Sequence, residues 1–102
     1  MRLPRMLFAV GTVVVIISGA TYAAANGDPR ARDWAAGCLG CHQPAGGTIP
    51  RLHGQSRDEL AAKFRSFRDG RQPGTVMPQL AKGYTDAQID AIAAWFATAQ
   101  AP

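Results

Sequence analysis

Cys38-Leu39-Gly40-Cys41-His42 is the stretch of sequence that decides how the rest of the chain is organised. It is a C-x-x-C-H pentapeptide, and it contains the only two cysteines among the 102 residues. Two thiols at this spacing can add across the two vinyl groups of a haem, and the histidine that follows can then bind the iron as an axial ligand. The motif predicts one covalent haem, haem c, anchored by Cys38 and Cys41, with His42 on the iron.

The first quarter of the sequence has the layout of a secretory signal peptide. A basic start is followed by an uncharged run over residues 6–20 and by small residues of the A-x-A kind. This pattern predicts cleavage after Ala25 or Ala23, so that residues 1–25 are a signal peptide and residues 26–102 form the mature domain. An uncleaved membrane anchor is the alternative, because the apolar run approaches the ~20 residues that span a bilayer. In both cases we expect a periplasmic domain, associated with the membrane only if the anchor is retained.

A mature domain of this size needs more than an ordinary hydrophobic core. Residues 26–102 are fewer than the ~80 residues below which a domain usually needs additional stabilisation. A disulfide between Cys38 and Cys41 would close so short a loop that it would remove little entropy from the unfolded chain. A haem places a large apolar disc in the core. The small size of the domain therefore supports the haem independently of the motif.

The charge of the mature domain is close to balanced. Nine of the eleven basic residues remain after Arg2 and Arg5 leave with the signal peptide, against seven acidic ones. Basic and acidic residues are intermixed and the sequence has no recognition motif, so no nucleic-acid partner is expected. The middle of the domain is the most basic part, and we interpret it as a solvated face, the alternative being a docking patch for an acidic redox partner. Its basic residues are Arg57, Lys63, Arg65, Arg68 and Arg71.

Helical periodicity and capping signals predict an all-α fold with three main helices around one haem. A short first helix is expected to follow Asp28-Pro29 and to run toward the cysteine motif. Capping boxes at residues 56–59 and 85–88 predict where the second and third helices begin. Residues 43–55 and 71–83 are rich in glycine and proline and are expected to be loops. No stretch shows sustained strand alternation.

Two residues compete for the second axial position of the iron. Met77 is the only methionine in the mature domain, lies in an expected loop, and precedes a proline that stiffens the backbone. Its thioether is a soft ligand that favours ferrous iron, although a methionine can also simply fill a gap in a core. His53 follows His42 so closely that it could hardly reach the opposite face, and a surface or haem-edge position is expected for it. Ligation by His42 and Met77 together would leave no position for substrate and would favour electron transfer over catalysis.

At this point the sequence resembles a class I cytochrome c over essentially all of the mature domain. The matching elements are the C-x-x-C-H motif, a P-x-L-x-G loop at residues 50–54, the pair Met77-Pro78, and a last helix with aromatic residues. The resemblance implies the small all-α cytochrome c fold. It also implies that Trp95 or Phe96 packs the last helix across the first, near Gly37.

The same resemblance implies which residues contact the cofactor. These are Cys38, Cys41, His42, Pro50, Leu52 and Met77. The carbonyl of Pro50 would accept a hydrogen bond from the ring of His42 and so orient it, while Leu52 would line the haem pocket. His53 is a departure, because the family more often has a small residue there.

The segment over residues 76–89 indicates two kinds of relative. It resembles small bacterial periplasmic electron carriers, and it is also similar to the cytochrome subunit of flavocytochrome c sulfide dehydrogenase. We therefore expect a carrier of single electrons between redox proteins and not an enzyme by itself, with a flavoprotein as one partner to consider. Two other functions are weaker alternatives: gas binding at a five-coordinate haem, which would require that Met77 does not ligate, and thiol redox chemistry of Cys38 and Cys41, against which the lack of a βαβ pattern counts.

Overall fold

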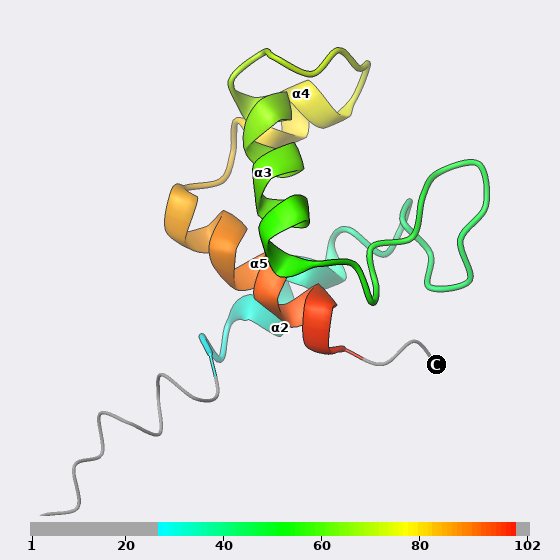
Figure 1. Cartoon of the computed structure of the whole chain (residues 1–102), viewed down its shortest axis with the longest axis vertical. Helices are drawn as coiled ribbons and strands as arrows, with labels where there is room; N and C mark the ends of the chain where they lie inside the picture. Colours follow the sequence, from blue (N-terminus) through cyan, green and yellow to red (C-terminus); the bar gives the residue numbers. More distant parts are fainter. Residues whose placement is uncertain (1–26, 100–102) are drawn as a thin grey trace, which may run out of the picture.

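The computed structural model describes residues 27–99, which form four α-helices and no β-strand (Figure 1). The helices are α2 (Ala31–Ala36), α3 (Arg57–Arg68), α4 (Met77–Ala81) and α5 (Asp86–Thr98). α5 packs against both α2 and α3, and α4 packs against α3. The predicted all-α class is thus confirmed for this part of the chain.

The predicted signal peptide, residues 1–25, lies outside the described residues. Within residues 27–99, none of the helices is long and apolar enough to cross a membrane.

Capping residues fix where the two long helices begin. The Ser56 hydroxyl accepts a hydrogen bond from the Glu59 N–H at 3.4 Å, and α3 starts one residue after Ser56. At α5 the capping box is reciprocal: Thr85 Oγ1 accepts from the Gln88 N–H at 3.2 Å, and Gln88 Oε1 accepts from the Thr85 N–H at 2.9 Å. Both predicted capping positions are confirmed, because each bond satisfies a backbone N–H that has no partner inside its helix.

The core is small and lies along α5. Ile89 and Phe96 are the largest fully buried side chains among the described residues. One cluster joins Ile92 and Phe96 to Ala35 of α2, and another joins Ile89 and Ala93 to Ala61 of α3. Alanines at these positions let the helix backbones approach closely.

One expectation about local structure was wrong. Residues 71–83 were expected to be a loop, but they contain α4, because proline is tolerated in the first turn of a helix, where an N–H has no intrahelical partner in any case.

The last helix packs across the first near Gly37, as expected, through Phe96. Phe96 belongs to one cluster with Ala35, and Cys38 packs against that cluster. A Cβ added at Gly37 itself would meet only the Trp34 carbonyl, at 3.6 Å.

Candidate functional site

The cysteine motif continues α2 as one further helical turn. The Cys38 N–H donates to the Ala35 carbonyl at 2.9 Å, and the His42 N–H donates to the Cys38 carbonyl at 2.9 Å. Cys38 and His42 are therefore four residues apart on one turn, on the same side of it. Cys38 packs against the core cluster that contains Phe96, while Cys41 is exposed, and no disulfide joins the two.

Burial raises the pKa of the Cys38 thiol above its ordinary value. Redox-active thiol pairs need the reverse, because a thiolate is the attacking species and a lowered pKa supplies it at neutral pH. The buried environment of Cys38 therefore argues against its acting as the attacking thiolate of a redox pair.

The ring of His42 is held in a defined orientation. Its Nδ1 lies 2.6 Å from the carbonyl oxygen of Pro50. A carbonyl can only accept, so Nδ1 carries the hydrogen and the lone pair of the neutral ring is on Nε2. A histidine whose Nδ1–H is held by a backbone carbonyl is the usual arrangement for a metal-binding imidazole. The contact implied by the resemblance to class I cytochromes c is present.

The loop that supplies this carbonyl is fastened to α5. The Gly54 N–H donates to the Phe96 carbonyl at 3.1 Å, and Leu52 packs against the cluster that contains Phe96. Gly54 has a φ of +76°, a left-handed conformation that strongly favours glycine. Residues 37–55, which we call the histidine segment, thus bring Cys38, His42, Pro50 and Leu52 into one region.

His53 does not lie on the surface, which was one of the two positions expected from the sequence. It is only 4% exposed, and its ring meets the rings of Trp95 and Phe96 edge-on at centroid distances of 5.7 and 5.1 Å. Its buried Nδ1 has no hydrogen-bond partner among the described residues. A glycine- and proline-rich loop suggested exposure, but the bond from Gly54 to Phe96 draws this part of the loop onto α5. His53 therefore packs as a core side chain.

Met77 lies in a different region, as the first residue of α4. It is half-buried, and α4 packs against the C-terminal part of α3 (Figure 1). The histidine segment leads into the other end of α3, which at twelve residues is about 18 Å long. We call residues 69–85 the methionine segment. The two segments are thus joined to opposite ends of α3.

The chemistry of these residues fits a haem. Three large apolar side chains are exposed, namely Ile49 at 44%, Val76 at 58% and Leu80 at 53%. Ile49 is next to Pro50, and the other two flank Met77, so apolar surface is concentrated at the two segments that carry the predicted ligands. Among residues 27–99 no group of three or more His, Cys, Asp or Glu could hold a metal ion.

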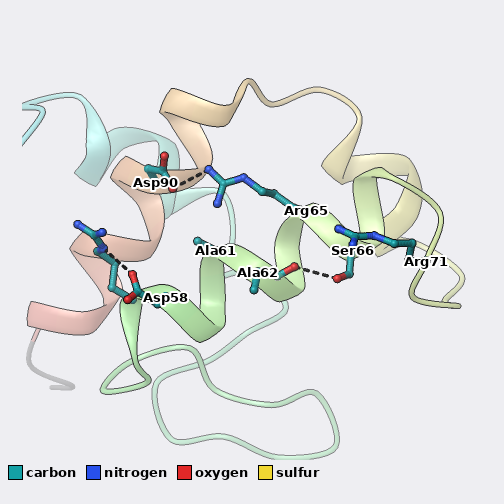
Figure 2. A pocket seen from close by; sticks show the side chains of 8 residues that line it. Asp58, Ala61, Ala62, Arg65, Ser66, Arg71 and Asp90 are labelled. Atoms are coloured by element: carbon teal, nitrogen blue, oxygen red, sulfur yellow. Dashed lines mark hydrogen bonds and ion pairs between the residues drawn. The ribbon is translucent and has the colours of Figure 1, made fainter.

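The basic residues of α3 are largely paired. Figure 2 shows the depression beside α3, where Arg65 reaches Asp90 of α5 at 2.7 Å. Arg65 and Arg68 also bind Asp86 at 3.0 and 2.8 Å, and their hydrogen bonds hold the pKa of that carboxyl below its ordinary value. Arg57 and Arg71 pair with Asp58 and Asp69. The acids that neutralise this face favour a solvated face over a docking patch for an acidic partner.

Comparison with known proteins gives consistent matches. Residues 25–96 match the family described as cytochrome C oxidase, cbb3-type, subunit III. The chain is 37% identical over 62 residues to the cytochrome subunit of sulfide dehydrogenase of Chlorobaculum tepidum, which covers 58% of this chain and 56% of that protein.

Two further relatives carry another name. The chain is 37% identical over 98 residues to the thiosulfate dehydrogenase electron acceptor of Thiomonas intermedia, covering 90% of this chain and 43% of the relative. It is 34% identical over 67 residues to the protein of the same name from Stutzerimonas stutzeri, covering 59% of this chain and 31% of the relative. The chain thus spans about half, or less, of the length of these relatives.

Proposed function

Because this chain belongs to the c-type cytochromes, we propose that it carries single electrons through a haem whose iron is bound by His42 and Met77. Membership of the family means that the cofactor is covalently bound haem c and that the protein works in electron transfer. The axial ligands and the residues that line the haem are the proposed part. The observation that supports them most strongly is the 2.6 Å contact between His42 Nδ1 and the Pro50 carbonyl, which leaves Nε2 available to the iron.

Each residue of the site has one task in this proposal. Cys38 and Cys41 hold the haem through thioether bonds, and Leu52 covers it from the core side. Pro50 keeps the His42 ring in place and makes it a better donor to the metal. When bound, the haem supplies a one-electron iron couple.

Met77 completes the set from the other segment. A thioether stabilises ferrous iron over ferric iron, which raises the reduction potential. With both axial positions taken by side chains, substrate has no place on the iron, and the remaining activity is transfer of an electron through the haem to a bound partner.

Replacing Met77 tests this proposal directly. In the ferric haem-loaded protein, Met77→Ala is expected to abolish the absorption band of a methionine–iron bond at the red end of the spectrum and to lower the midpoint potential. Leu80→Ala, on the same short helix, is the matched control and is expected to keep both properties. An unchanged band in the Met77→Ala protein would exclude methionine as the ligand and leave a gas-binding haem as the function to examine.

For the electron donor we propose a dehydrogenase that oxidises an inorganic sulfur compound. The support is that the relatives are named as the cytochrome subunit of sulfide dehydrogenase and as electron acceptors of thiosulfate dehydrogenase. A flavoprotein is the partner suggested by the resemblance of residues 76–89 to the cytochrome subunit of flavocytochrome c sulfide dehydrogenase. Stable copurification with a flavin-containing subunit would favour the subunit function, whereas a monomeric haem protein that is reduced by an added dehydrogenase would favour a diffusible carrier.

The proposed location is the periplasm, with residues 1–25 removed as a signal peptide. Cytochromes of this kind are typically exported. The mass of the protein from a periplasmic fraction tests this, because cleavage after Ala25 or Ala23 and addition of one haem give defined masses. Recovery of the full-length mass from the membrane fraction would instead support an uncleaved anchor.

A further inference from the structure

Among the glycines that the structure describes, Gly74 has the least space for a side chain. A Cβ placed on Gly74 would come within 3.1 Å of Pro78 Cδ and 3.2 Å of Phe67 Cε1. Both distances are shorter than ordinary contacts between carbon atoms. A side chain at Gly74 would thus have to share its space with a ring of α3 and a ring of α4.

The glycine is needed here for space and not for its backbone freedom. Glycines with a positive φ include Gly70, which ends α3 with a φ of +78°, but Gly74 is not among them. Any residue can therefore adopt its backbone conformation. What a side chain would change at this position is the separation between Phe67 and Pro78.

We propose that Gly74 is a positioning residue that sets where α4, and with it Met77, lies relative to α3. Pro78 directly follows Met77, and its ring has little freedom to move independently of the α4 backbone. This inference rests on the proposed ligation of the iron by Met77. It adds that the strength of that bond depends on a contact made three residues before the ligand.

Ion pairs at the two ends of the methionine segment restrict how α3 can respond to a change at Gly74. Arg68, at the end of α3, reaches Asp86 in the first turn of α5 at 2.8 Å, so the two ends of the segment are fastened together. Arg65 also joins α3 to α5 through Asp86 and Asp90. With α3 fixed in this way, a methyl group at Gly74 has to displace the start of α4 by a few tenths of an ångström. Packed interiors transmit small displacements of this kind because they have few voids.

The test is competition for the iron in the ferric haem-loaded protein. Imidazole binds only when it displaces the methionine, so a weaker methionine bond gives a tighter apparent imidazole affinity. Gly74→Ala is expected to tighten imidazole binding about tenfold, equivalent to about 1.4 kcal/mol, and to weaken the methionine–iron absorption band. Gly83→Ala is the matched control. It adds the same methyl group after α4, where the nearest atom is the Leu80 carbonyl oxygen at 3.4 Å, and imidazole affinity is expected to stay at the wild-type value.

A second substitution separates positioning from general damage. Phe67→Leu removes Phe67 Cε1, one of the two ring carbons within 3.2 Å of the added methyl group, and gives that group space on the side away from Pro78. The double variant Gly74→Ala/Phe67→Leu is therefore expected to return toward the wild-type imidazole affinity. If Gly74→Ala does not assemble with haem, assembly of the double variant would identify the tight contact as the cause. Failure of both to assemble would overturn the proposal.

The outcomes also distinguish this inference from the proposed function. A wild-type protein that binds imidazole as tightly as Met77→Ala would refute methionine ligation, and the inference with it. A wild-type protein that resists imidazole, together with a Gly74→Ala variant that resists it equally, would leave the proposed function intact and refute the role of Gly74.

Discussion

The histidine segment and the methionine segment hold their proposed iron ligands in different ways. In the histidine segment His42 directly follows Cys41, and the hydrogen bond that its Nδ1–H donates to the Pro50 carbonyl orients its ring. In the methionine segment no covalent anchor precedes the ligand. The position of Met77 depends on packing at Gly74 and on ion pairs that join α3 to α5.

This difference separates the tasks of the two segments. Under the proposed ligation, thioether bonds would keep the haem next to His42 even when the iron–nitrogen bond breaks, so the histidine segment would determine whether the haem is retained. The methionine segment could then release Met77 from the iron without loss of the cofactor. It is therefore the side on which the protein can adjust the reduction potential.

The largest effect is expected when the covalent anchors are removed. Cys38→Ser with Cys41→Ser should give a protein without covalent haem that loses helical structure, because so small a core needs the apolar disc. Met77→Ala should retain its haem and its helices, because the anchors lie in the other segment. Mass spectrometry under denaturing conditions and far-ultraviolet circular dichroism measure both properties. Haem retained by the double serine variant, or lost by Met77→Ala, would contradict the division between the segments.

A smaller effect is expected at Gly54, which fastens the histidine segment to α5. Its φ of +76° places an alanine in the left-handed region, and no atom lies within 4 Å of the added Cβ, so the cost comes from the backbone alone. Gly54→Ala should lower the free energy of unfolding of the haem-loaded protein by about 1–2 kcal/mol in a denaturant titration. Gly83→Ala, without a positive φ, is the control. Equal losses in the two variants would refute a special backbone requirement at Gly54.

The same contrast explains how much could be predicted from the sequence. The haem motif and the capping boxes at Ser56 and Thr85 are each formed by residues within five consecutive positions. A local pattern of this kind can be recognised from the sequence alone. The starts of α3 and α5 were predicted for that reason. The contact from His42 to Pro50 was accessible only through the resemblance to a known family.

Features that depend on distant residues were missed. His53 is buried because Gly54 bonds to Phe96, which lies 42 positions further along the chain. The arginines of α3 looked like a basic face because their partners, Asp86 and Asp90, belong to another helix. The sequence around Gly74 predicted a turn, but nothing in it indicated that the rings of Phe67 and Pro78 would both lie close to Gly74.

The smallest effect is expected when the charge of Asp86, next to the end of the methionine segment, is removed. Asp86→Asn keeps an oxygen that can accept from Arg65 and Arg68 but removes the ion pairs. The variant should lose its methionine–iron absorption band at a slightly lower temperature than the wild type at neutral pH, and added salt should narrow the difference by screening. Asp33→Asn, in the first turn of α2, is the matched control. It also removes an acid from a helix start, but no ion pair of Asp33 occurs among the described residues.

The pH dependence of the difference in thermal stability between wild type and Asp86→Asn tests whether the charge of Asp86 causes it. Because arginine hydrogen bonds lower the pKa of Asp86 below its ordinary value of 3.8, the folded state gains stability from the ionised form. This gain is fully present well above pH 3.8 and is lost as the pH falls from there through the lower pKa of the folded state. The gap between wild type and Asp86→Asn should therefore close in that acidic range, while the Asp33→Asn protein follows the wild type. A gap that persists below the folded-state pKa would mean that shape or hydrogen bonding, and not charge, fastens the segment that carries Met77.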